Sequence, residues 1–250
     1  MRTVEGWIST PDTFRGGGRS AETKGVPTSP VVTWSAFGPG NLDGTRPGVG
    51  LRCASVLKPL YAWVAPSSLE ADAERSVRYS DNAATDTVVS ACGGVVGTLQ
   101  RVAALTGLLV APGQTWGRVV VDAPQVARLY RALAVADDPR SAQVRAWMRG
   151  VPDSQRLGLD RLWAQLTGQP VAQVGIKLGW DISEDEPFAR THAVLLGPTR
   201  SVVVMTAVPV TAHLRSRWNA LLASEGPTAV LALHDDLSGP LLRAALHSCA

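Results

Sequence analysis

The sequence has few cysteines, histidines and lysines and no long apolar run, and each shortage excludes a class of protein. Its three cysteines in 250 residues are too scattered for a disulfide framework or a zinc cluster. The four histidines show no metal-ligand spacing such as HExxH. No stretch of about 18 apolar residues is present, so we expect no membrane span. Phosphate-binding glycine loops, the GxSxG motif and internal repeats are also absent.

The charge balance is nearly even, which argues against a nucleic-acid partner. The 24 Lys and Arg residues exceed the 21 Asp and Glu residues by only three. A nucleic-acid binder usually shows a clustered basic face, and none is evident. The first residues also lack the apolar segment of about 7–15 residues that a secretory signal needs. We therefore expect a cytoplasmic protein, or a secreted one whose leader has been removed.

The hydrophobic share of 45% is that of a globular protein, and we predict one domain over residues 1–250. An irregular arm over residues 1–30 precedes it. Apolar periodicity and Gly/Pro breaks predict the elements that follow. We expect strands over 31–37, 48–53, 171–178, 191–197 and 201–209, and helices over 55–64, 82–91, 95–105, 124–134, 141–149 and most of 212–250, with a break at 226–227.

This order of elements predicts an α/β fold class of the three-layer α+β type. An antiparallel sheet is built from both chain ends, about 31–54 and 170–250. An all-helical lobe, about 55–169, is inserted between them. The cleft between the two lobes is the natural ligand site.

Lysine is scarce, and its positions point to chemistry. Only Lys24, Lys58 and Lys177 are lysines, whereas the other 21 basic residues are arginines. Arginine stays protonated, but a desolvated lysine can lose its proton and act as a base. Two of the three lysines lie in short polar motifs.

The first motif is SVLK at 55–58. Positions i and i+3 share one face of a helix, so Ser55 Oγ and Lys58 Nζ can meet at a helix start. Lys58 would then take the proton of Ser55, and Ser55 would attack a carbonyl to form an acyl-enzyme. The alternative is an ordinary surface serine and lysine.

The second motif is YSDN at 79–82, directly before a predicted helix. The Ser80 hydroxyl can relay a proton to a leaving group, and Asn82 can bind both a substrate amide and the lysine. The alternative is helix capping, because Ser, Asp and Asn are the preferred N-cap residues.

The third motif is KLGW at 177–180 on a predicted strand. Lys177 would add positive potential to the cleft and orient Ser80. Gly179 would let a substrate lie close to the strand backbone. The N–H of Trp180 would pair with that of Ser55 as an oxyanion hole. The alternative is a strand-ending glycine beside a surface lysine.

Together and in this order, the three motifs resemble those of the penicillin-recognising serine enzymes, the class A β-lactamases and D-alanyl-D-alanine peptidases. The resemblance spans about residues 31–210 and implies the β-lactamase/transpeptidase-like fold. It implies that Ser55 is the nucleophile and Lys58 its base. It places Ser80 and Asn82 in the second element and Lys177 and Gly179 in the third, and it requires no metal or organic cofactor.

Three departures from this family bear on the substrate. Only the 24 residues 56–79 separate Ser55 from Ser80, so the helical lobe is trimmed. Leu178 stands where the family has the Thr or Ser that contacts a substrate carboxylate. The region 110–121 lacks the Glu that activates the deacylating water in class A β-lactamases. Gln114 cannot act as a base at neutral pH, and Asp122 is a predicted N-cap.

We therefore predict a serine acyl-enzyme hydrolase or acyltransferase acting on an amide, ester or thioester, with a small-molecule or peptide acyl substrate. Trp116, Leu178, Gly179 and Trp180 are the predicted substrate-binding residues. One alternative is a weak β-lactamase or D,D-peptidase. Another is a catalytically silent member that binds a ligand or a protein partner. The sequence leaves the oligomeric state open.

Overall fold

The structure, a computed structural model, describes residues 29–38, 42–46, 50–182 and 187–250. Nearly all of the arm predicted over residues 1–30 lies outside the described residues, as does the start of the strand predicted over 48–53. The prediction of a single domain over the whole chain stays a prediction.

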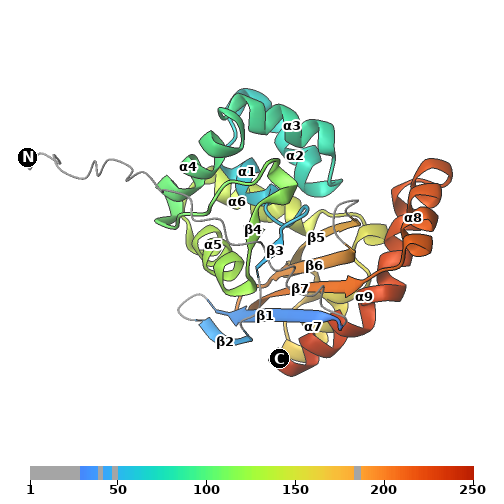
Figure 1. Ribbon diagram of the computed structural model, residues 1–250. Coiled ribbons are helices and arrows are strands. Elements are labelled where there is room, and N and C mark those ends of the chain that lie inside the picture. Colours follow the sequence, from blue (N-terminus) through green and yellow to red (C-terminus); the bar gives the residue numbers. More distant parts are fainter. Residues whose placement is uncertain (1–28, 39–41, 47–49, 183–186) are drawn as a thin grey trace, which may run out of the picture.

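The centre of the molecule is a five-stranded antiparallel sheet made from both ends of the chain (Figure 1). Strand β1 pairs along its length with β7, so that Val31 lies opposite Ala207 and Phe37 opposite Ser201. The predicted strands over 31–37, 191–197 and 201–209 are confirmed, whereas β2 was not predicted. The order across the sheet is β2 (Leu42–Arg46), β1 (Val31–Phe37), β7 (Ser201–Pro209), β6 (Phe188–Leu196) and β5 (Gly175–Ile182).

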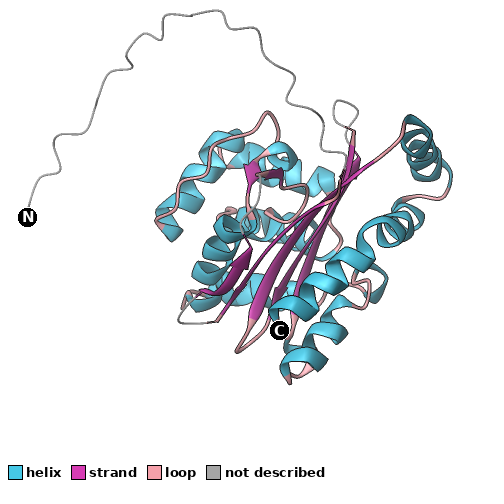
Figure 2. Cartoon of the chain, turned by 60° about the horizontal axis from the view of Figure 1, so that its bottom comes forward, coloured by secondary structure: helices cyan, strands magenta, loops and turns pink. Residues whose placement is uncertain are grey.

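Both faces of this sheet are buried, which produces the three predicted layers. Along β7, Val203 and Met205 join one hydrophobic cluster, while Val202 and Val204 join the other. Successive side chains of a strand point to opposite faces, so an uninterrupted apolar run needs cover on both sides. Helices lie on both sides of the sheet in Figure 2.

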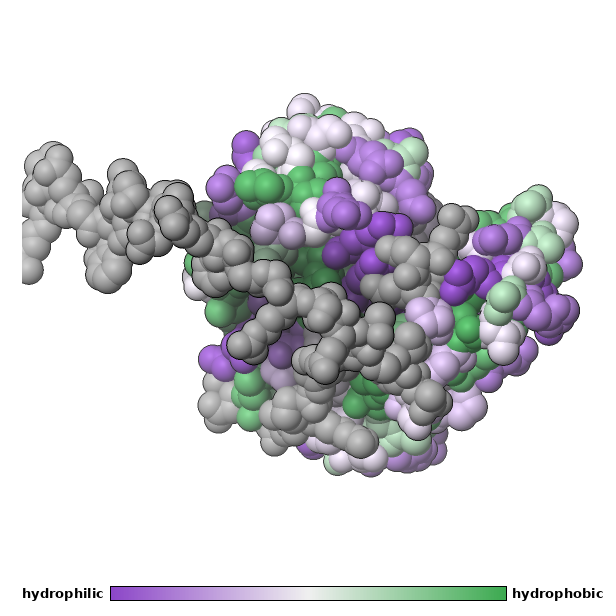
Figure 3. Space-filling view, in the orientation of Figure 1, coloured by the Kyte–Doolittle hydropathy of each residue, from purple (hydrophilic) through white to green (hydrophobic). Residues whose placement is uncertain are grey.

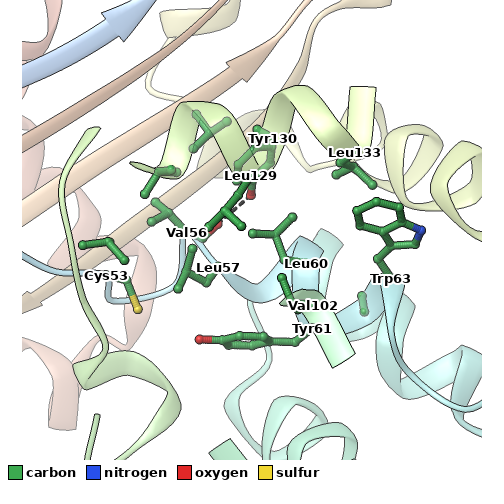
Figure 4. Packing of buried hydrophobic residues seen from close by; sticks show 14 of the residues in the cluster. Cys53, Val56, Leu57, Leu60, Tyr61, Trp63, Val102, Leu129, Tyr130 and Leu133 are labelled. Carbon is green, nitrogen blue, oxygen red and sulfur yellow. Dashed lines mark hydrogen bonds between the residues drawn. The ribbon is translucent and has the colours of Figure 1, made fainter. Parts of the chain in front are cut away.

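The helical lobe covers one face and packs around a short central helix, α1, whose six residues are all buried. In Figure 4, Leu60 of α1 points toward Leu129 and Tyr130 of α5, whereas Tyr61 points to the other side of α1, toward Cys53. Tyr130 Oη donates a hydrogen bond to the carbonyl of Val56 at 2.5 Å. This lobe contains α1 (Lys58–Trp63), α2 (Glu70–Arg78), α3 (Asn82–Ala91), α4 (Gly94–Thr106), α5 (Ala123–Val135) and α6 (Pro139–Arg149).

The opposite face is covered by α7 (Leu159–Thr167) and the long α9 (Pro227–Cys249), which follows α8 (Ala212–Ser224). Helix α7 was not predicted. It lies within the range that we assigned to the helical lobe, yet its Leu159 and Trp163 pack in the second cluster with α9. The boundary expected at residue 169 is therefore wrong, because the chain crosses to the other face of the sheet before α7.

Short elements and caps complete the fold. Asp81 and Asp122 accept hydrogen bonds from the third following amides and so cap α3 and α5. Gly107 ends α4 with a φ of 71°, a left-handed conformation that favours glycine. The remaining elements are the small sheet of β3 (Leu51–Arg52) with β4 (Val120–Val121) and the 3₁₀ turns η1 (Ser67–Leu69), η2 (Trp116–Arg118), η3 (Asp153–Gln155) and η4 (Val171–Gln173).

Within the described ranges, no individual helix combines the length and apolar character of a membrane span. The consecutive helices α3 and α4 meet those criteria only as a pair, with a bend of 75° between them.

Candidate active site

Ser55 lies in the turn that leads into α1. The helix begins at Lys58, three residues later than predicted, and the Lys58 amide donates to the carbonyl of Ser55 at 3.3 Å. Ala54, the residue immediately before Ser55, has a φ of 47°, which is unusual for a residue with a side chain. Ser55 is half-buried and lines a cleft of about 530 Å³. Within the described residues, no hydrogen bond joins its hydroxyl to the amine of Lys58, which binds Ser80 and Asn82 instead.

The amine of Lys58 lies under this cleft and is fully buried. Lys58 Nζ donates to the carbonyl of Ser80 at 2.6 Å and to Asn82 Oδ1 at 2.7 Å, and it lies 3.4 Å from Ser80 Oγ. Burial lowers the pKa of Lys58 to about 7, although the nearby carboxylates of Asp81 and Asp86 oppose the shift. A lysine with this pKa exchanges protons at neutral pH, as a general base must.

In the turn before α3, one residue caps the helix and two others contact Lys58. Asp81 caps the helix by accepting from the amide of Ala84 at 3.0 Å, while Ser80 and Asn82 are bound to Lys58. Ser80 has a φ of 56°, and only Ala54 and Leu157 share a positive φ among the described non-glycine residues. Such backbone conformations persist where the surroundings hold them, often at functional sites. Capping is therefore confirmed for Asp81, whereas the proton relay by Ser80 and the substrate binding by Asn82 stay predictions.

Lys177 reaches the same hydroxyl from the edge strand β5. Its Nζ donates to Ser80 Oγ at 2.8 Å and to the carbonyl of Leu178 at 2.7 Å. Burial and, secondarily, the charge of Lys58 lower the pKa of Lys177 well below its ordinary value. The structure thus brings Ser80 Oγ between two amines that burial drives toward their neutral forms. These hydrogen bonds form a continuous path along which a proton can pass between Lys58 and Lys177 through Ser80.

Gly179 allows β5 to lie directly against the turn that carries Ser55. A Cβ added at this position would stand 2.7 Å from the Ser55 nitrogen and 2.9 Å from the Val56 nitrogen. We predicted that the missing side chain makes room for a substrate. The space beside Gly179 is instead filled by the backbone of Ser55 and Val56, so the glycine lets β5 lie against the turn that carries Ser55.

The other predicted substrate-binding residues divide between the cleft and the core. Trp180 and Trp116 line the cleft with Ser55. Leu178 does not line it: the side chain is 5% exposed and packs in the cluster between the sheet and α9. Because side chains alternate along a strand, Leu178 points away from the face that Lys177 presents to Ser80.

Trp116 forms a wall over the buried amine. Lys58 Nζ lies 4.6 Å from the centroid of the indole, and Trp116 Nε1 donates to Asp86 Oδ1 at 2.7 Å. The hydroxyl of Tyr61 donates to the carbonyl of Trp116 at 3.0 Å. The ring is thus fixed from its side chain and from its backbone.

The fold of this chain is similar to that of several solved structures. No family model matches the sequence, and no curated protein matches it. Among solved structures, similar folds include a variant of the last common ancestor of Gram-negative class A β-lactamases (TM-score 0.53, 18% identity, covering 82% of this chain and 93% of that one). They also include the β-lactamase of Streptosporangium roseum (TM-score 0.56, 16% identity, covering 72% of this chain and 85% of that one). The β-lactamase of Streptomyces albus G is similar as well (TM-score 0.53, 19% identity, covering 74% of this chain and 86% of that one).

The chain has the class A β-lactamase fold. The predicted fold is thereby confirmed, including the antiparallel sheet built from both chain ends. At 16–19% identity the likeness is one of fold, so the chemistry must be argued from this chain's own residues.

Within this β-lactamase fold, the loop before α5 brings no carboxylate of its own to the cleft. Asp122 Oδ1 accepts from the Gln125 amide at 2.7 Å and caps α5, as predicted. Gln114 Oε1 accepts from Arg118 at 3.2 Å and does not line the cleft. The carboxylate bound to this loop is that of Asp86, which comes from α3.

His192 is a positioning residue that sequence reasoning missed. Its Nδ1 accepts from the amide of Thr206 at 3.2 Å, so its Nε2 carries the proton and donates to the carbonyl of Arg52 at 2.8 Å. Burial lowers the pKa of His192 to about 4, which keeps the ring neutral. It ties β6 to the strand that precedes Ser55. An isolated histidine in a strand carries no sequence signal for this role.

Across the described residues, no group of three or more His, Cys, Asp or Glu side chains is arranged to hold a metal ion. All three cysteines are free and buried, and burial raises the pKa of Cys53, two residues before Ser55, to about 12. The thiol of Cys53 is therefore unreactive at neutral pH.

Proposed function

We propose that the protein is a serine acyl-enzyme hydrolase or acyltransferase that acts on an amide, ester or thioester through Ser55. The observation that carries this proposal is the hydrogen-bonded chain Lys58–Ser80–Lys177, whose central Ser80 lines the same cleft as Ser55. If Ser55 and Lys58 were an ordinary surface serine and lysine, the amine of Lys58 would be exposed. It is instead fully buried, and its pKa is lowered to about 7.

In the acylation step, the neutral amine of Lys58 takes the proton of the Ser55 hydroxyl as Ser55 Oγ bonds to the carbonyl carbon. The carbonyl oxygen becomes an oxyanion, for which the amides of Ser55 and Trp180 are the proposed donors. The bond to the leaving group then breaks, and the leaving group takes a proton from Ser80 Oγ. Lys58 returns its proton to Ser80 across the 3.4 Å that separates them.

The second half-reaction favours an acceptor other than bulk water. A deacylating water needs a base, and the wall over Lys58 is the indole of Trp116 instead of a carboxylate. Hydrolysis of the acyl-enzyme is then slow, and transfer to an alcohol, amine or thiol that itself binds in the cleft competes with it.

A β-lactamase or D,D-peptidase activity is the weaker alternative. The substrates of that class present a carboxylate, and a site that binds such a group discriminates strongly against its absence. Leu178 offers no hydroxyl and points into the core. Turnover of nitrocefin or of a D-Ala-D-Ala peptide at a rate above that with a simple ester would favour this alternative.

The direct test is covalent labelling of the wild-type protein with a fluorophosphonate, followed by intact-mass spectrometry. We expect one adduct on the wild type, none on Ser55→Ala, and an unchanged adduct on Ser154→Ala. Ser154 is the matched control because it lines the same cleft without a lysine partner. An adduct that persists in Ser55→Ala contradicts the proposal. No adduct on any protein, with ligand binding that survives Ser55→Ala, identifies the catalytically silent alternative.

A further inference from the structure

We propose that the cleft has an aromatic subsite between Trp180 and Trp218, which binds an apolar, preferably aryl, group of the substrate. The inference rests on the proposed function, because it concerns the substrate of the same cleft. No sequence pattern connects these two residues, which lie 38 positions apart on a strand and a helix.

The two indoles come from different layers of the molecule and meet at the cleft. Trp180 lies on β5 next to Gly179, whose backbone abuts the Ser55 turn. Trp218 lies on α8, and its ring centroid is 6.3 Å from that of Trp180 at an interplanar angle of 67°. Both rings are half-buried and line the same cleft as Ser55. Their free surfaces therefore face the volume next to the nucleophile.

Helix α8 contributes to this wall although it buries little of itself. None of its residues is fully buried, and it projects from the body beside α9 (Figure 1). On the face seen in Figure 3 it carries a mixture of hydrophilic and apolar residues. Its Trp218 and its 39% exposed Leu222 nevertheless line the cleft, together with the buried Leu231 of α9. Apolar side chains left half-exposed in one concave surface mark a ligand site.

A buried histidine holds Trp218 in place. Trp218 Nε1 donates to His234 Nε2 at 3.0 Å, and His234 Nδ1 lies 3.0 Å from Thr191 Oγ1. His234 must be neutral to accept at Nε2, and burial lowers its pKa to about 4. Its ring also packs 5.4 Å from that of Trp180. The aromatic wall is thus ordered before a ligand arrives, which reduces the entropy lost on binding.

The charges of the cleft point to a substrate group without a carboxylate. Among the described lining residues, the charged side chains are Asp81, Arg118 and Asp181. Asp181, next to Trp180, is paired with Arg190 at 3.3 Å. These three side chains give the lining no excess of positive charge that would attract a carboxylate, whereas an aryl or alkyl group meets apolar surface at the aromatic wall.

The test compares p-nitrophenyl phenylacetate with p-nitrophenyl acetate, which share a leaving group and differ in the aryl group. We expect wild-type kcat/KM to favour the phenylacetyl ester by at least about 10-fold. Trp218→Ala should lower this ratio toward one, and Trp218→Phe should largely restore it. Benzyl acetate against ethyl acetate forms a second arm, which shows whether the subsite takes the acyl group or the leaving group. Equal ratios for wild type and Trp218→Ala in both arms overturn the subsite.

A binding measurement separates failure of the subsite from failure of the proposed function. Calorimetric titration of Ser55→Ala with phenylacetamide and with acetamide needs no acyl-enzyme. Binding of phenylacetamide at least about 10-fold tighter, lost in the Ser55→Ala/Trp218→Ala double variant, supports the subsite even if no ester is turned over. Equal binding of the two amides overturns it even if Ser55 is labelled by a fluorophosphonate.

Discussion

At the scale of single residues, the site depends on how burial lowers the pKa values of two amines. Lys58 and Lys177 are both buried beside Ser80, and among the described residues no carboxylate hydrogen-bonds to either amine. An unpaired buried charge is unfavourable, so each amine moves toward its neutral form. The burial that lowers the pKa of Lys58 also makes this residue a source of pH-dependent stability.

This linkage predicts a pH effect on unfolding. The pKa of Lys58 is about 7 in the folded state and about 10.4 when unfolded, so between these values the unfolded state binds more protons. Stability of the wild type therefore rises with pH from about 7 to 10. Relative to Lys58→Met, we expect a gain of about 1 kcal/mol per pH unit in urea-unfolding experiments at pH 7, 8 and 9. Parallel curves for the two proteins would contradict the assignment.

Asp86 predicts an effect on the pH–rate profile. Its carboxylate raises the pKa of Lys58, opposing burial, while its Oδ1 accepts the Trp116 hydrogen bond. Asp86→Asn keeps an acceptor and removes the charge. The rise of kcat/KM for p-nitrophenyl acetate with pH, which reports deprotonation of Lys58, should therefore move to lower pH. Asp137→Asn, an exposed charge change outside the cleft, should leave the profile where it is. A shift to higher pH in Asp86→Asn would exclude this role.

At the scale of elements, the site is formed where three segments converge: the turn before α1, the turn before α3 and the edge strand β5. Only the close approach of β5 to the Ser55 turn lets Lys177 reach Ser80. That approach depends on the absence of a side chain at one position, Gly179.

Gly179→Ala should therefore separate the strand from the nucleophile. Its Cβ would meet the backbone nitrogens of Ser55 and Val56 at 2.7 and 2.9 Å, and backbone atoms cannot rotate away. Displacement of a reacting group by about 1 Å lowers rates about 100-fold, and we expect a loss of this order in kcat/KM. Gly117→Ala is the matched control, because its Cβ would lie 3.6 Å from the Ala54 carbonyl, an ordinary contact. Equal activity of both variants would show that β5 has room to move.

At the scale of the whole molecule, the sheet joins the two hydrophobic clusters. Neighbouring residues of β7 belong to different clusters, so neither cluster can come apart without disturbing the same strand. The cleft lies where the helical lobe, the sheet edge and the C-terminal helices meet. Its geometry therefore depends on both clusters at once.

Substitutions in either cluster should consequently lower the stability of the whole protein, which should still unfold in a single transition. Leu129 and Leu242 are buried in the first and second clusters respectively. Leu129→Ala and Leu242→Ala should each lower stability by about 2–5 kcal/mol. Calorimetry and near-ultraviolet circular dichroism should show one coincident transition in each variant. Two separated transitions in either variant would show that the lobes unfold independently.

Local patterns in the sequence were sufficient to predict the candidate site residues and the approximate positions of most elements. Scarce lysines, polar triplets beside predicted helices and the order of the motifs were enough to predict Ser55, Lys58, Ser80, Asn82 and Lys177 together. Element predictions succeeded where apolar periodicity or a cap was strong, as in α3 and α5. They failed for α7 and β2, where no such pattern distinguished the segment.

The neighbours of these residues, in contrast, follow from the folded chain alone. Sequence periodicity says that Leu178 and Lys177 face opposite ways, but not which of them faces the cleft. Likewise, three contacts of the site join segments that are distant in the chain. They are those of Gly179 with Ser55, of Trp116 with Asp86, and of Trp218 with His234. Contacts of this kind, and the burial that sets the pKa of each lysine, arise from the path of the whole chain, so no local pattern encodes them.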